Sequence, residues 1–165
     1  MNGRSEQYRL VVVLLLLVVL QFALRPFLGD FRSSPDLLLL ALLVYAIRAR
    51  PGQAAVAGFL VGLVVDSLTP VAFGAGMLAH TVVGYLAAWG KAVFFAENLI
   101  VNAGFFFVGT WLRDLLVLVA GRHMVQSAMA WQLVFWSPIK ALTTAIVGVV
   151  VLMLFRRWLP IRITE

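Results

Sequence analysis

Six apolar segments follow one another along this sequence, and they restrict its fold more than any other feature. They cover approximately residues 8–25, 36–48, 53–68, 71–90, 97–120 and 138–158. Hydrophobic residues make up 63% of the 165 residues, and no polar stretch is long enough to fold alone. The sequence therefore predicts an all-α integral membrane protein with six transmembrane helices, arranged as a single membrane domain over residues 1–165.

Two regions do not have the form of a simple spanning helix. Segment 36–48 is short, so we expect it to have little tilt, to use snorkelling flanks or to thin the bilayer locally. Residues 121–137, "GRHMVQSAMAWQLVFWS", are too few and too mixed in polarity to span. Their aromatic residues, such as Trp131, favour the boundary between water and lipid. We interpret 121–137 as an interfacial or re-entrant segment before a last helix that starts at Pro138.

Basic residues indicate the orientation of the chain. Its net charge of +6 comes from 13 Lys and Arg against 7 Asp and Glu, and most of these charges lie at segment ends. With a cytoplasmic N-terminus, the inner ends hold Arg4, Arg9, Arg48, Arg50, Lys91, Arg156, Arg157 and Arg162. The outer ends hold Arg25, Arg32 and Arg122. Because cytoplasmic loops are enriched in Lys and Arg, both termini are predicted to face the cytoplasm. In a membrane protein this charge is a topology signal, and it does not indicate a nucleic-acid partner.

The sequence contains no motif that predicts an enzyme or a cofactor. It has no cysteine, which excludes disulfides, thiolate metal sites and thiol catalysis. It also lacks a Walker motif, a His-Glu-x-x-His metal motif and a convincing pair of catalytic carboxylates. We therefore expect a non-enzymatic protein without a metal or cofactor.

Small residues recur every four positions in the third and fourth segments. The third carries Ala54, Gly58, Gly62 and Asp66, and the fourth carries Ala72, Gly76, His80, Gly84 and Ala88. A spacing of four places residues on one helix face, and small residues let helices approach closely in lipid. These two stripes predict a tight helical hairpin.

The polar members of the stripes allow several interpretations. Asp66 can cap or close the turn at the outer membrane face, make a polar contact in a pocket or partner interface, or relay protons. His80 fits an interhelical hydrogen bond better than a metal site, because the other histidine, His123, lies in a loop. We predict that Asp66 closes the hairpin.

Further charged residues fall inside the apolar segments, where they are costly and usually face the protein interior. Under the predicted topology the outer half holds Asp36, Asp66, His80, Arg113, Asp114 and Lys140. Arg113 and Asp114 are adjacent and so point in different directions, which predicts separate partners or an Arg113 that snorkels. Lys140 is expected to snorkel to the head groups. This mixed-sign group favours a water-accessible cavity or a docking site over a path for ions through the membrane.

The stretch "SPDLLLLALLVYAIRARPGQAAVAGFLVGLVVDSLTPVAFGAGMLAHTVVGYLAA" (34–88) resembles the MreD family of rod shape-determining proteins. The resemblance is carried by Pro35 and Asp36 at the start of the second segment, by Gly58, Gly62 and Asp66, and then by Gly74 and Tyr85. It covers most of the chain, with its specific motif in residues 35–85. The candidates for structural or partner-binding roles are Pro35, Asp36, Gly58, Gly62, Asp66, Gly74, Gly76, His80, Gly84, Arg113, Asp114 and Lys140.

The resemblance implies a multi-pass protein of the bacterial cytoplasmic membrane that binds MreC. Through MreC it would affect RodA, a class B penicillin-binding protein and MreB, and thereby peptidoglycan synthesis and rod shape. The family's fold is similar to the S components of energy-coupling-factor transporters. The alternative function is therefore an S component for vitamin uptake. S components commonly dock through small residues on their first helix, and the first segment here is bulky, which favours the scaffold.

Overall fold

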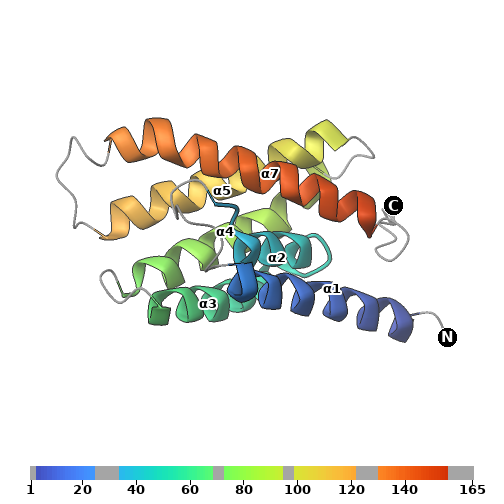
Figure 1. Cartoon of the computed structure of the whole chain (residues 1–165). Coiled ribbons are helices and arrows are strands. Elements are labelled where there is room, and N and C mark those ends of the chain that lie inside the picture. The colour runs from blue at the N-terminus through green and yellow to red at the C-terminus, as the bar shows by residue number, and fades with distance from the viewer. Residues whose placement is uncertain (1–2, 25–33, 69–72, 95–98, 122–129, 156–165) are drawn as a thin grey trace.

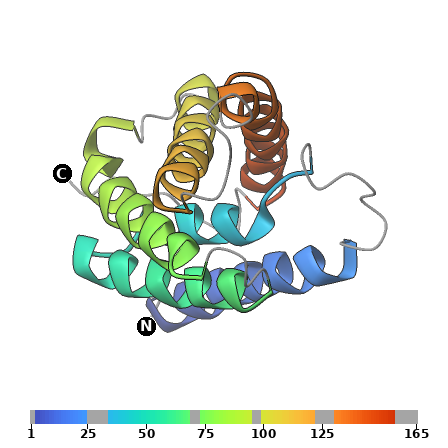
Figure 2. The ribbon, with the colours of Figure 1, turned by 90° about the vertical axis from the view of Figure 1, so that its left-hand side faces the viewer.

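The described residues of the computed structural model are 3–24, 34–68, 73–94, 99–121 and 130–155. They form six α-helices: α1 (Gly3–Leu24), α2 (Leu37–Ala46), α3 (Pro51–Leu68), α4 (Ala75–Phe94), α5 (Leu99–Gly121) and α7 (Ser137–Leu154). A π-helical turn, η2 (Gln132–Trp136), leads into α7. Figures 1 and 2 show α2 in the middle, between α5 and α7 on one side and α1 and α3 on the other.

Three helical stretches are long and apolar enough to cross a membrane: Pro51–Leu68, Ile100–Gly121 and Gln132–Leu154. Two further apolar stretches, Tyr8–Leu24 and Leu37–Ala46, are shorter. The chain is thus all-helical over its described part and has at least these three candidate spans. Six spans and cytoplasmic termini remain predictions from the sequence.

The central helix α2 is a core helix, surrounded by other helices on its sides. Nine of its ten residues are buried, and only Tyr45 is partly exposed. Ten residues extend only about 15 Å, whereas the hydrocarbon layer is about 30 Å thick. Segment 36–48 is therefore enclosed by its neighbours, while its tilt and its effect on the bilayer stay predictions from the sequence.

Helices α3 and α4 pack with their backbones in close approach. The buried residues of α3 are its predicted stripe, Ala54, Gly58, Gly62 and Asp66. A Cβ added at Gly62 would lie 2.6 Å from the carbonyl oxygen of Gly76, and one added at Gly84 would lie 2.5 Å from that of Ala54. Because backbone atoms cannot turn aside as a side chain can, glycine is required at these contacts. The predicted hairpin is present.

The last helix begins earlier than the sequence indicates. Residues 122–129 of the predicted interfacial segment 121–137 lie outside the described residues, but 130–136 are helical and continue into α7. Pro138 has no N–H to donate to the carbonyl of Leu133, five residues earlier, which is where a π-helical bond would end. The indole N–H of Trp111 donates to that carbonyl instead, at 3.4 Å. The proline is thereby accommodated inside the helix.

Candidate functional site

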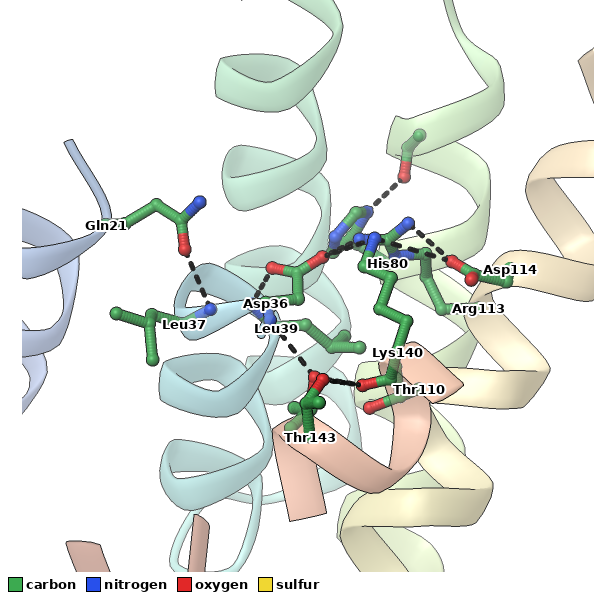
Figure 3. A network of polar contacts seen from close by, with 12 residues as sticks. Gln21, Asp36, Leu37, Leu39, His80, Thr110, Arg113, Asp114, Lys140 and Thr143 are labelled. Atoms are coloured by element: carbon green, nitrogen blue, oxygen red, sulfur yellow. Dashed lines mark hydrogen bonds and ion pairs between the residues drawn. The ribbon is translucent and has the colours of Figure 1, made fainter. Parts of the chain in front are cut away.

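The start of α2 is buried, and neighbouring side chains satisfy its backbone groups (Figure 3). Asp36 is the N-cap, and its Oδ1 accepts the N–H of Leu39 at 3.0 Å. Gln21 of α1 accepts the N–H of Leu37 at 2.8 Å, and the hydroxyl of Thr144 in α7 accepts the N–H of Asp36 at 3.1 Å. Free N–H groups at a helix start are costly when buried, so these three acceptors fix the position of α2 between α1 and α7.

Four charged side chains converge on this helix start, and we call them the charge cluster: Asp36, Arg113, Asp114 and Lys140. Arg113 forms an ion pair with Asp36, and its Nη1 donates to Oδ1 of Asp114 at 2.7 Å. Nζ of Lys140 lies 3.6 Å from Oδ2 of Asp36 and 3.8 Å from Oδ1 of Asp114. Two cations and two carboxylates balance one another, which makes their burial tolerable.

Sequence-based expectations about these residues are met only in part. Arg113 and Asp114 do have separate partners, because Arg113 pairs with Asp36 and Asp114 pairs with Lys140. They also pair with each other, against expectation, because the long arginine side chain can turn back toward its neighbour. Lys140 does not snorkel away from the protein, since its ammonium group lies in the charge cluster with a side chain only 18% exposed. In both cases the carboxylate of Asp36 attracts the cation inward.

Asp66 forms a second polar group, at the start of α4. Its Oδ2 accepts the N–H groups of Gly74 at 2.8 Å and Met77 at 3.0 Å, and its Oδ1 accepts that of Gly76 at 3.1 Å. Gly74 has a φ of +99°, a conformation that glycine adopts without strain. Of the alternatives weighed for Asp66, this geometry is that of a cap that closes the hairpin of α3 and α4.

His80 lies between the Asp66 cap and the charge cluster. Its side chain is fully buried, and its Nδ1 hydrogen-bonds to the carbonyl oxygen of Gly76 at 2.7 Å. This bond lies within α4, whereas the sequence analysis expected His80 to form a hydrogen bond between two helices. His80 follows Gly76, whose N–H Asp66 accepts, by one helical turn, and Figure 3 draws it in the polar network of Arg113 and Lys140.

Comparison with known proteins identifies the family. The family model described as rod shape-determining protein MreD matches residues 4–160, nearly the whole chain. The chain belongs to the MreD family. No curated protein and no solved structure matches it. The likeness to transporter S components therefore stays an expectation, while membership in a rod shape-determining family and the long apolar helices support a membrane protein with a role in cell shape.

The candidate residues for structural or partner-binding roles occupy two places. Asp36 joins Arg113, Asp114 and Lys140, with half-buried Pro35 just before it. The other members lie in the hairpin, where Asp66, Gly74 and Gly76 form its turn, His80 points toward the charge cluster, and Gly58, Gly62 and Gly84 line the packed faces.

Sequence reasoning missed two polar residues of this MreD-family site, Gln21 and Thr144. Both were visible in the sequence, Gln21 as an isolated polar side chain in a long apolar segment and Thr144 as one of a pair with Thr143. Thr144 also follows Lys140 by four residues, which places the two on one helix face. The site thus gathers polar groups from α1, α2, α5 and α7.

The site is a buried group of ion pairs that links neighbouring helices. Both carboxylates of the charge cluster are engaged by cations, so neither is a free base. Within the described ranges, no group of three or more His, Cys, Asp or Glu side chains could hold a metal ion. The cluster connects three helices at one point in the bundle.

Proposed function

We propose that this chain is a non-enzymatic membrane scaffold of the bacterial cell-elongation machinery, which binds MreC in the cytoplasmic membrane. Through MreC it acts on the assembly that contains RodA, a class B penicillin-binding protein and MreB, and so on peptidoglycan synthesis and rod shape. Membership in the MreD family supports this role.

The observation that carries the proposal is the division between a polar interior and an apolar exterior. The cations and carboxylates of the charge cluster pair with one another inside the bundle. Large apolar side chains point outward along the helices, for example Leu15 of α1, Phe59 of α3 and Ile146 of α7. In a bilayer such faces meet either lipid or another apolar helix, and helices associate there by close packing. A transmembrane helix of MreC is a partner of that kind.

The scaffold acts by binding one conformation or assembly of its partner more tightly than another. A binding protein shifts a conformational equilibrium only by its difference in affinity for the two states. The chain therefore controls MreC by binding one arrangement or oligomeric state of it more tightly. The alternative, an S component for vitamin uptake, finds no support in α1, whose outward residues, such as Val12, Leu16 and Val19, are bulky.

Co-purification tests the proposal. The chain is expressed with MreC from the same genome, extracted in mild detergent and run through size exclusion. The matched control is an MreC whose transmembrane segment is replaced by an unrelated apolar helix of equal length. Co-elution with MreC and loss with the control are expected. Separate elution of two well-folded proteins contradicts the scaffold, and a vitamin-sized molecule retained by the chain would favour the transporter.

Two glycines on the exterior allow the docking face to be mapped without disturbing the fold. A Cβ added at Gly104 of α5 or at Gly52 of α3 meets no atom within 4 Å. Gly104→Leu and Gly52→Leu therefore add bulk to two different faces. If MreC packs on one of them, only the leucine on that face weakens co-elution, and the other variant serves as its control.

A further inference from the structure

Four buried side-chain polar atoms among the described residues form no hydrogen bond with the protein. They are Nε2 of His80, Nε of Arg113, Oγ of Ser137 and Oδ1 of Asn102. The residues that carry them are at most 9% exposed. Most buried polar atoms in proteins are hydrogen-bonded, and an unsatisfied one is destabilising. His80 and Arg113 belong to the same polar network, so their two atoms indicate a missing partner common to both.

The hydrogen bond from His80 to Gly76 determines which ring nitrogen carries the proton, and therefore which kind of partner the other nitrogen needs. A carbonyl oxygen only accepts, so the proton of the neutral ring is on Nδ1. Nε2 then carries a lone pair and needs a donor. The nearby cations do not supply it, since Nε2 has no hydrogen-bond partner in the described part of the chain.

Lys140 and Arg113 need a hydrogen-bond acceptor, whereas Nε2 of His80 needs a donor. The ammonium group of Lys140 has three N–H donors, but its distances of 3.6 and 3.8 Å to the carboxylates exceed hydrogen-bond length. Nε of Arg113 is a further donor without an acceptor. Ser137 lies one turn before Lys140 on the same face of α7 and can either donate or accept.

We propose that His80, Arg113 and Lys140 bind a neutral hydroxyl group, which donates to Nε2 of His80 and accepts from the two cations. Figure 3 draws His80 in the same polar network as Arg113 and Lys140. A hydroxyl oxygen donates and accepts at once, whereas a carbonyl or ether oxygen has nothing to donate. An anion is disfavoured because the charge cluster is already neutral, and an added charge would be buried without compensation.

Two sources carry this chemistry: an ordered water, or the hydroxyl of a bound molecule such as a polyol head group. Both give His80 the same hydrogen bond, so the site is defined by a hydroxyl that donates to His80 and accepts from the two cations. This site does not depend on MreC binding, and its test is independent of the co-purification described above.

Nitrogen NMR of the histidine ring tests the site directly. The chain has two histidines, and the second, His123, lies outside the described residues. A His123→Gln chain labelled with ¹⁵N-histidine reports His80 alone and keeps every residue of the site. It is reconstituted in bilayers of phosphatidylcholine, whose head group has no hydroxyl, and separately of phosphatidylglycerol, whose head group does.

The expected spectrum shows a neutral ring with the proton on Nδ1, and an Nε2 resonance moved upfield from that of a free imidazole nitrogen. Magnetisation transfer from water protons, lost in D₂O and equal in both lipids, assigns the hydroxyl to water. Transfer from carbon-bound protons of a ligand, retained in D₂O, assigns it to a bound molecule. A ring protonated on Nε2, a doubly protonated ring, or a free Nε2 without transfer from either source overturns the proposal.

Discussion

The carboxylate of Asp36 caps α2 through Oδ1 and pairs with the guanidinium of Arg113 in α5. One side chain thus performs two tasks, because it completes the backbone hydrogen bonds of the central helix and neutralises a buried cation. Since α2 lies in the core, the stability of the whole bundle depends on this contact.

Replacement of Asp36 separates its two tasks. Asp36→Asn keeps a capping oxygen but removes the charge, and we expect a loss of about 3–5 kcal/mol because buried cations lose their partner. Asp36→Ala also removes the cap and costs about 1 kcal/mol more. Denaturant unfolding in detergent micelles measures both. Lys140→Gln is the control and should cost less, since its ion pairs are longer. Equal stability of Asp36→Asn and the unchanged chain would contradict the role of the ion pair.

The Asp66 cap predicts a local effect at the start of α4. In Asp66→Leu the N–H groups of Gly74, Gly76 and Met77 lose their acceptor, and we expect destabilisation of roughly 1–3 kcal/mol. Hydrogen exchange of these amides should increase more than that of the interior of α5. If exchange at residues 74–77 stays unchanged, the carboxylate does not hold the turn. Perturbed assembly with MreC is expected as a consequence.

The close approach of α3 and α4 predicts a strong contrast between glycines. A Cβ at Gly62 would lie 2.6 Å from the carbonyl oxygen of Gly76 and 2.7 Å from the backbone nitrogen of Met77, so Gly62→Ala should cost about 1–3 kcal/mol. Gly62→Leu should be worse, because it separates the two backbones. Gly104→Ala, on the open surface of α5, should be neutral or gain up to about 1 kcal/mol of helix propensity. A Gly62→Leu chain as stable as the unchanged one would refute the packing argument.

The effects of replacing Trp111 and Pro138 on the free energy of unfolding are predicted to be non-additive. Trp111→Phe removes the donor to the carbonyl of Leu133 and should cost about 0.5–1.5 kcal/mol. Pro138→Ala restores a backbone N–H in the helix, so Trp111→Phe should cost less in that background. A double-mutant cycle of unfolding free energies measures the difference. Purely additive effects would show that the indole does not replace the missing backbone donor.

The sequence predicted local and periodic features well. The stripe of α3 follows from its spacing of four, and the stripe residues are the buried ones. The run of leucines at the start of α2 is apolar all round, which already indicates a buried helix, yet the search for spans led us to interpret it as a short transmembrane segment.

Contacts between distant segments could not be predicted in the same way. Asp36 and Thr144 are 108 residues apart, and no local pattern connects them. The sequence placed Asp36, Arg113, Asp114 and Lys140 in the same half of the protein but did not show how they pair. The error over Arg113 and Asp114 arose because helical spacing describes the direction of Cβ and not the reach of a long, flexible side chain.

The pairing of Asp36 with later helices has a consequence for biogenesis. The ribosome delivers Asp36 to the insertion machinery well before it synthesises Arg113 and Lys140. Until then the carboxylate has no counter-charge from these residues, and the short α2 has no enclosure from α5 and α7. The arrangement of the first four helices is therefore incomplete until α5 and α7 have been synthesised. A chain truncated before residue 130 should be recognised and degraded by membrane proteases, even though it retains the hairpin of α3 and α4.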